Sequence, residues 1–127
     1  MDSMEEGTME DEEDLASQVL TMSIEGELDA EDMTEIGAEL FRLAHRGWRR
    51  IVIDLGGVSH IDYRGLKPLA ARAELYRSGG GDIKLCRVSA YLFAILRAVG
   101  VHEAFDVHGT AEDAQAAFSA ERLQSVA

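Results

Sequence analysis

The stretch that decides the fold is Ile51–Leu66, with the sequence IVIDLGGVSHIDYRGL. Its first three residues are apolar in succession, which is typical of a central strand buried on both faces of a sheet. A turn and a second short apolar segment follow, and Asp62 then stands at the start of a helix. A helix N-terminus carries unpaired N–H groups and partial positive charge, so partners, phosphates and carboxylates are recognised there. The residues at this terminus, Asp62–Leu66, therefore decide what the chain can do.

The segments on either side alternate between strand and helix patterns. Strands are predicted over residues 18–24, 50–55, 82–88 and 104–107, and helices over residues 30–45, 66–78, 90–99 and from 111 onward. Asp29, Ser89 and Thr110 are suitable N-caps for three of these helices. A turn is expected over Gly26–Asp29, and the first strands are candidates for antiparallel pairing. The pattern predicts an α/β fold in which helices pack on a small sheet.

Length and composition limit the class of protein. A chain of 127 residues with 46% hydrophobic residues is expected to form one domain around one core. It has neither an apolar run of about 18 residues nor a basic and apolar start, so no membrane insertion and no secretory signal are expected. The single cysteine, Cys86, lies in an apolar run and is expected to be buried and inert. The chain is therefore expected to be cytoplasmic.

Much of the net charge of −12 belongs to the N-terminus. Residues 1–14 hold eight acids and no lysine or arginine, whereas the other 113 residues carry a net charge of −4. Such a block is expected to form a disordered acidic tail, and the acidic balance disfavours a nucleic-acid partner. One interpretation makes the tail a solubility segment. The other makes it a mask for a basic patch, with residues 10–14 folded back on Arg64 and Lys67.

Residues that could support catalysis do not form a recognisable set. Asp54, His60 and Asp62 match no metal-ligand spacing, and an acid at a helix start is explained by capping. Ser59 and Ser89 lack a credible base and orienting acid, so nucleophilic catalysis is unsupported. We expect no enzymatic activity, no metal and no cofactor.

Arg64 is unusual because a cation in the first turn of a helix faces the unfavourable end of the helix dipole, at a cost of about 0.3–1 kcal/mol. It is either a solvated surface residue or, with Lys67 nearby, a spot that recognises a carboxylate or phosphate. Phe93 falls outside the inward stripe of its helix. It is either covered by a loop or exposed as an anchor for a partner.

The ordered motifs along residues 18–120 resemble the STAS domain family, typified by bacterial anti-sigma factor antagonists. The resemblance rests on these segments: Gly26–Asp29; Asp54-Leu55, Val58, Ile61-Asp62 and Gly65-Leu66; then Gly79-Gly80, Leu85, the helix capped by Ser89, and Gly100. It implies a small α/β domain, over residues 15–123, that works by binding. Family members typically dock on a histidine-kinase-like ATPase that doubles as an anti-sigma factor. That partner phosphorylates a Ser or Thr in an Asp-Ser-[Ser/Thr]-Gly-Leu loop, and the phosphate breaks the complex.

The resemblance also implies that the usual switch is missing here. Arg64 occupies the phospho-acceptor position, and Tyr63 precedes it. A phosphate would add about −1.5 to −2 charge at this position, whereas arginine fixes +1. Tyr63 and Ser59 are the remaining alternative acceptors, although the usual partner kinases modify Ser or Thr.

The sequence therefore predicts a non-catalytic protein-binding regulatory module for signal transduction and transcription regulation. Its expected partner is a kinase-like anti-sigma ATPase or another signalling ATPase. The expected contact residues are Asp62, Tyr63, Arg64, Gly65, Leu66, Lys67 and Phe93. The alternatives are a regulatory subunit on a transport ATPase of the ABC type, as some STAS relatives are, and a self-associating scaffold subunit.

Overall fold

The structure is a computed structural model that describes the backbone of residues 15–126 and the side chains of residues 15–121. The acidic tail predicted over residues 1–14 lies outside the described residues. Helices predicted from the 3.6-residue periodicity are confirmed, whereas the direction of the first strands and some strand ends differ from the predictions.

One sheet of four parallel strands, in the order β1-β2-β3-β4, forms the centre of the fold. The strands are β1 (Val19–Leu28), β2 (Arg50–Ile61), β3 (Asp82–Cys86) and β4 (Asp106–His108). The expected antiparallel pairing of the first strands is wrong. A 16-residue helix follows β1 and returns the chain to the end where β1 began, so Val19 pairs with Arg50 and the two strands run in the same direction.

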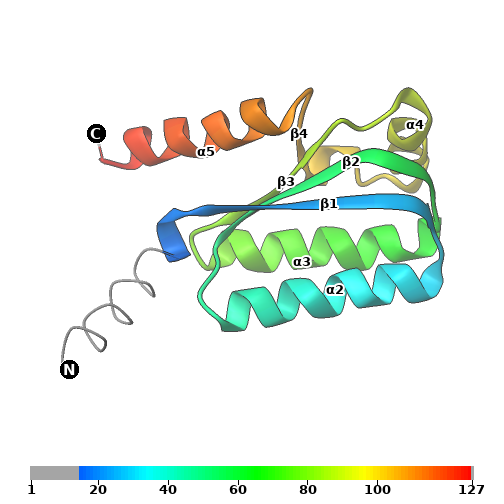
Figure 1. Cartoon of the computed structure of the whole chain (residues 1–127), viewed down its shortest axis with the longest axis horizontal. Helices are drawn as coiled ribbons and strands as arrows, with labels where there is room; N and C mark the ends of the chain where they lie inside the picture. Colours follow the sequence, from blue (N-terminus) through cyan, green and yellow to red (C-terminus); the bar gives the residue numbers. More distant parts are fainter. Residues whose placement is uncertain (1–14, 127) are drawn as a thin grey trace.

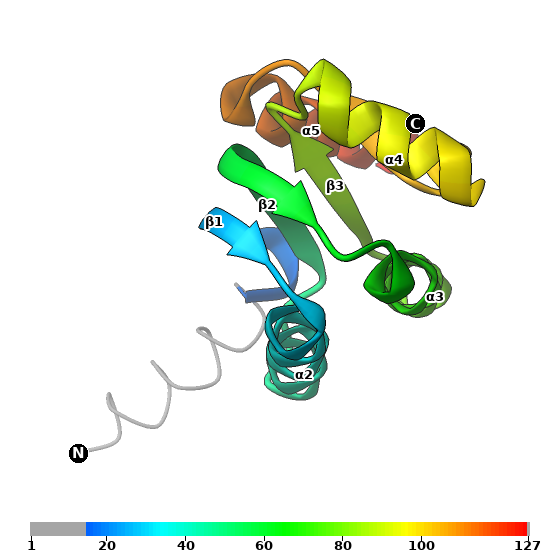
Figure 2. The ribbon, with the colours of Figure 1, turned by 90° about the vertical axis from the view of Figure 1, so that its right-hand side faces the viewer.

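Helices cover both faces of this sheet (Figure 1). On one face lie α2 (Ala30–His45), α3 (Leu66–Ser78) and α4 (Ala90–Val99), and on the other lies α5 (Ala111–Val126), as Figure 2 shows from the side. Two short 3-10 helices, η1 (Tyr63–Gly65) and η2 (His102–Ala104), precede α3 and β4. The α/β architecture with helices packed on a small sheet is therefore confirmed.

The predicted N-caps are confirmed by hydrogen bonds. The Asp29 carboxylate accepts from the Asp32 N–H at 2.8 Å, and the Ser89 and Thr110 hydroxyls each accept from the N–H three residues on, at 3.1 and 3.0 Å. Each bond satisfies one backbone donor that a helix start leaves unpaired.

The ends of all four strands differ from the predictions. β2 was predicted to end at Leu55 before a turn, but it continues to Ile61 because residues 57–61 stay paired with β1, and β3 ends at Cys86 rather than at residue 88. Gly26 and the two residues after it, predicted as part of a turn, continue β1, which shifts its register against β2 twice. The strands pass so closely there that a Cβ at Gly57 would lie 2.9 Å from the Cβ of Glu25. The segment 104–107 is also not one strand, because Ala104 belongs to η2 and β4 begins at Asp106.

The alternation of side chains along the strands creates two cores. Ile51 and Ile53 of β2 face the large core between the sheet and helices α2, α3 and α4. Val52 faces a small core under α5 that also contains Cys86 and Phe118. The prediction that Cys86 is buried is confirmed.

Candidate protein-docking site

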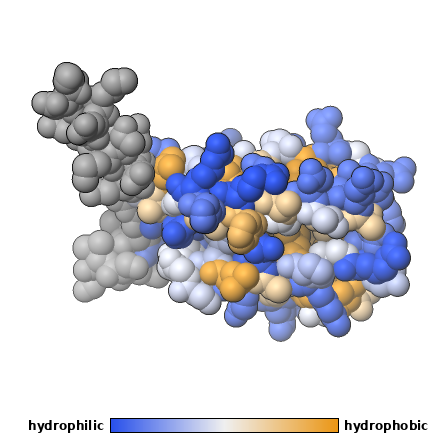
Figure 3. Space-filling model, turned by 90° about the horizontal axis from the view of Figure 1, so that it is seen from below, coloured by the Kyte–Doolittle hydropathy of each residue, from blue (hydrophilic) through white to orange (hydrophobic). Residues whose placement is uncertain are grey.

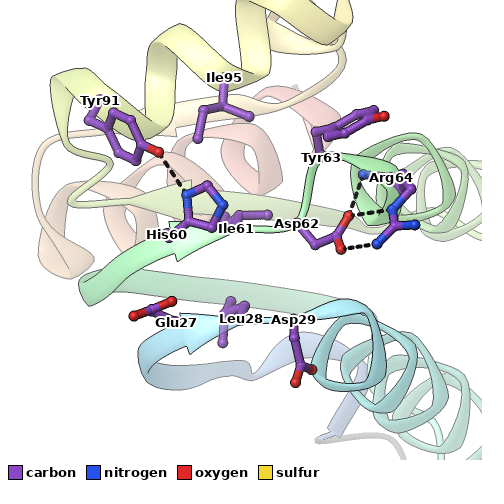
Figure 4. A pocket seen from close by; sticks show the side chains of 10 residues that line it. All are labelled: Glu27, Leu28, Asp29, His60, Ile61, Asp62, Tyr63, Arg64, Tyr91 and Ile95. Atoms are coloured by element: carbon purple, nitrogen blue, oxygen red, sulfur yellow. Dashed lines mark hydrogen bonds and ion pairs between the residues drawn. The ribbon is translucent and has the colours of Figure 1, made fainter.

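A shallow hollow of about 450 Å³ lies at the carboxyl ends of β1 and β2, where ligand sites of parallel α/β sheets are commonly found. Figure 4 shows the two strand ends side by side, with α4 on one side of the hollow and the start of α3 at its end. Its lining residues are Glu27, Leu28, Asp29, His60, Ile61, Asp62, Tyr63, Arg64, Tyr91 and Ile95.

Gly65 fixes the position of η1 beside α2. A Cβ at this position would lie 2.5 Å from the Cβ of Met33, so only glycine allows this approach. The next residue, Leu66, is buried in the large core and begins α3. The prediction that the regular helix starts at Leu66 is confirmed. The expected contact residues Gly65 and Leu66 do not line the hollow, because Gly65 packs against Met33 and Leu66 is buried.

Asp62 and Arg64 form a two-pronged ion pair on the wall of the hollow. Arg64 Nε donates to Asp62 Oδ1 at 3.0 Å, and Arg64 Nη2 donates to Asp62 Oδ2 at 2.7 Å. The backbone N–H of Arg64 also donates to Asp62 Oδ1, at 2.9 Å, so the same carboxylate caps η1. Such bidentate charged pairs are among the stronger hydrogen-bonded contacts in proteins.

This pair explains how a cation is accommodated at a helix start. The carboxylate of Asp62 lies between the guanidinium and the unpaired N–H groups, so it offsets the unfavourable position of Arg64. The hydrogen bond from the Arg64 side chain, followed by that from its backbone, lowers the pKa of Asp62 from 3.8 to about 2. Both groups are therefore charged throughout the neutral range, and the Arg64 side chain remains 69% exposed.

A second polar pair closes the other side of the hollow. His60 Nδ1 lies 2.7 Å from the Tyr91 hydroxyl, which joins the end of β2 to α4. Tyr91 is 54% exposed and was not among the expected contact residues. In the sequence, Tyr91 is noticeable only as an aromatic residue just after the Ser89 cap. No local pattern connects it with His60, which lies 31 residues earlier in the chain.

The other expected contact residues are distributed around the hollow. Tyr63 lines it and is 62% exposed, whereas Lys67 is exposed on the first turn of α3. Phe93 is partly buried against the large core, with the ring of His102 edge-on at 6.2 Å and the Arg97 guanidinium over its face at 5.1 Å. Phe93 is therefore covered by neighbouring residues, as the first of the two interpretations expected.

The three residues weighed as a metal or acid–base cluster are separately paired. Asp54 accepts from Gly56 N–H and from Arg87 Nε, each at 2.9 Å. Burial raises the pKa of Asp54, but these hydrogen bonds outweigh it, so its pKa is lowered. His60 pairs with Tyr91 and Asp62 pairs with Arg64, so each of the three side chains is engaged in a separate pair.

A buried lysine is the main feature that sequence reasoning missed. Lys84 in β3 is fully buried, and its Nζ lies 2.6 Å from Glu121, 2.7 Å from Asp106 and 3.3 Å from Asp82. Burial disfavours its charge, but the hydrogen bonds to Asp106 and Glu121 outweigh this and raise its pKa. The three carboxylates are close enough to hold a metal, but the ammonium occupies the position between them. In the sequence, the indication of this cluster is a lone lysine within an apolar strand.

The chain belongs to the STAS domain family, because residues 13–114 match the model of the STAS domain. It is 28% identical to the protein named "Putative anti-sigma factor antagonist BtrV" of Bordetella bronchiseptica. The alignment of 100 residues covers 79% of this chain and 86% of that protein.

Solved structures with the same fold include the following two. TM1081 from Thermotoga maritima superposes with a TM-score of 0.72 at 19% identity, covering 80% of this chain and 87% of that one. The unphosphorylated form of the anti-sigma factor antagonist SpoIIAA gives a TM-score of 0.66 at 16% identity, covering 87% of this chain and 92% of that one. Within the described residues, none of the helices combines the length and apolar character needed to cross a membrane.

Proposed function

We propose that this chain is a non-catalytic regulatory module that binds a kinase-like anti-sigma ATPase through the hollow and the exposed residues of η1 and α3. The proposal includes a second element: binding is not released by Ser/Thr phosphorylation at the usual position. The observation that carries it is the Asp62–Arg64 ion pair, which lies where the family resemblance places the phospho-acceptor loop.

Family membership and the names of the relatives support the regulatory role. BtrV and SpoIIAA are both described as anti-sigma factor antagonists, and the match to BtrV extends over most of both chains. The polar residues of the hollow support binding rather than turnover, because Asp62 pairs with Arg64 and His60 pairs with Tyr91.

The charge at position 64 supports the loss of the switch. A phosphorylated serine at this position would place a negative group beside the Asp62 carboxylate and repel it. Arginine instead attracts that carboxylate and supplies no hydroxyl. A domain with this pair is expected to stay in one binding state, and regulation would then act through the amount of protein or through another segment of the chain.

A tagged pull-down from the native organism tests the proposal, with bound proteins identified by mass spectrometry. Wild type is expected to retain a kinase-like ATPase, and Arg64→Ser is expected to become phosphorylated at residue 64 and to be released. Arg97→Ser is the matched control, because Arg97 lies over Phe93, outside the lining of the hollow. Retention of a transport ATPase in place of the kinase-like ATPase would overturn the proposal in favour of the transport alternative, and retention of only further copies of the chain would favour the scaffold alternative.

A further inference from the structure

A groove separate from the hollow runs between α2 and α3. It consists of two depressions of about 460 and 280 Å³. Arg72 lines both of them, so the two depressions adjoin at its side chain and together are called the groove. Arg64 stands at one end, where it also lines the docking hollow, and Arg49 lines the other end.

The groove combines apolar walls with positive charge. Small residues of α2, including Ala30, Gly37 and Ala38, leave the section near Arg64 open. Toward the Arg49 end, large apolar side chains are exposed to solvent, Phe41 at 57% and Leu75 at 61%. Figure 3 views the molecule from the α2 and α3 side, and apolar surface is visible there among hydrophilic side chains.

The charge of the lining is of one sign. Its titratable residues include three arginines and no carboxylate. Arg72 lies over the Phe41 ring, 5.6 Å from its centroid, and Arg49 donates to the backbone carbonyls of Ala44 and Trp48. Among the described side chains, neither Arg49 nor Arg72 has a carboxylate in ion-pair contact. Arg64, by contrast, forms an ion pair with Asp62. An acidic segment with apolar side chains would complement this lining.

The chain itself contains such a segment. Residues 1–14 carry eight acids, no lysine or arginine, and three methionines, at positions 1, 4 and 9. Methionine is flexible enough to fill irregular apolar surfaces. Figure 1 shows that the described chain starts at the end of the molecule where α2 and α3 finish, which is the Arg49 end of the groove.

The length of this segment suffices to follow the groove. The 13 residues of α3 span about 20 Å at about 1.5 Å per residue. An extended chain covers that distance with about six residues at about 3.3 Å each. A segment that followed the groove from this end would place residues 10–14 beside Arg49 and Arg72, and residues nearer the N-terminus beside Arg64. This order differs from the sequence-based hypothesis, which placed residues 10–14 on Arg64.

We infer that the groove between α2 and α3 is an intramolecular docking site for the acidic N-terminal segment, residues 1–14 of the same chain. The acids of the segment pair with Arg49, Arg72 and Arg64, and its methionines cover the exposed faces of Phe41 and Leu75. Because Arg64 borders both the groove and the hollow, the docked segment reaches the edge of the partner surface.

Paramagnetic relaxation enhancement in the full chain tests the inference. A nitroxide is attached to Thr8→Cys, since the native Cys86 is buried and does not compete for the label. The amides of Gly37, Arg72 and Leu75 are expected to lose most of their signal intensity, whereas that of Gln115 on α5 is expected to keep it. The effect should weaken at about 1 M salt, where the Debye length falls to about 3 Å.

Two sets of variants make the test specific. The labelled chain with the acids at positions 10–14 changed to amides should lose the effect, and so should Arg72→Gln. Arg97→Gln, the matched control outside the groove, should retain it. Unchanged broadening in the amide variant, or broadening spread evenly over the protein, would overturn the inference. Broadening of an isotope-labelled chain by a separate nitroxide-labelled chain would also overturn it, because the occupant would then be a second copy.

Discussion

The Asp62–Arg64 pair joins backbone capping and side-chain charge at one carboxylate. A serine at position 64 would leave the cap of Asp62 in place and remove the two side-chain hydrogen bonds. Residue 64 therefore controls the electrostatics of the hollow without being needed for the backbone turn.

The low pKa of Asp62 depends mainly on the Arg64 side chain. Arg64→Met should raise it from about 2 toward the usual value of 3.8, because the largest cause of the lowered pKa is the hydrogen bond from the Arg64 side chain. The carboxyl carbon shift of Asp62, followed by NMR during an acid titration, measures this change. Arg97→Met should leave the titration as in wild type, and an unchanged midpoint in Arg64→Met would contradict the prediction.

The lowered pKa of Asp62 also determines how this residue makes the stability of the fold depend on pH. A carboxyl whose pKa is lower in the folded than in the unfolded state stabilises the fold above its unfolded pKa. That contribution decreases as the pH falls from about 4 to about 2. Arg64→Met should therefore show a shallower loss of stability than wild type over this interval.

The buried ammonium of Lys84 links β3 to β4 and to helix α5. Lys84→Met should lower the free energy of unfolding by about 2–4 kcal/mol, because it leaves the carboxylates of Asp82, Asp106 and Glu121 close together without their cation. Urea unfolding of the full chain measures this loss, with exposed Lys67→Met as the matched control. A loss no larger than that of the control would show that the cluster does not stabilise the fold.

The raised pKa of Lys84 makes the stability of the fold depend on pH in the alkaline range. A lysine whose pKa is higher in the folded state stabilises the fold below its unfolded value, and this contribution is lost as the pH rises through the folded pKa. Wild type should therefore lose stability above about pH 10.5, whereas Lys84→Met should lack this component.

The approach of η1 to α2 depends on one missing methyl group. Gly65→Ala should cost about 1–3 kcal/mol, because its Cβ would lie 2.5 Å from the Cβ of Met33 and the helices would have to separate. Gly37→Ala is the control, since a Cβ there meets nothing within 4 Å and alanine favours the helix by about 1 kcal/mol. Thermal unfolding of both variants checks the opposite signs, and equal effects would show that the close approach carries no cost.

The accuracy of sequence-based prediction follows the range of each interaction. Helix positions and caps depend on residues within one or two turns, so the caps at Asp29, Ser89 and Thr110 could be predicted. Strand direction depends on which segments pair, and the cluster around Lys84 joins residues as far as 37 apart in the chain. Within the candidate site, Asp62–Arg64 is a local pair, whereas Tyr91 reaches His60 only through the packing of α4.

At the scale of the whole molecule, the docked segment and the partner compete at Arg64. Changing the acids at positions 10–14 to amides should tighten partner binding several-fold at low salt, and by less at about 1 M salt, because charge pairing is screened there. Titration calorimetry with the purified partner measures the affinities. The same kind of change at Glu112 and Asp113 of α5 is the control. Equal affinity of wild type and the tail variant would contradict competition while leaving the docking-site proposal intact.

Cys86 turns the small core under α5 into a kinetic reporter. It is the only thiol of the chain, it is fully buried, and burial together with nearby Asp54 raises its pKa. A thiol reagent therefore reacts only with molecules in which this core has opened, so the modification rate measures how often that happens. In a cell, the rate at which this thiol is oxidised would depend on how long the small core stays closed. Weaker packing beneath α5 would make the core open more often and the oxidation faster.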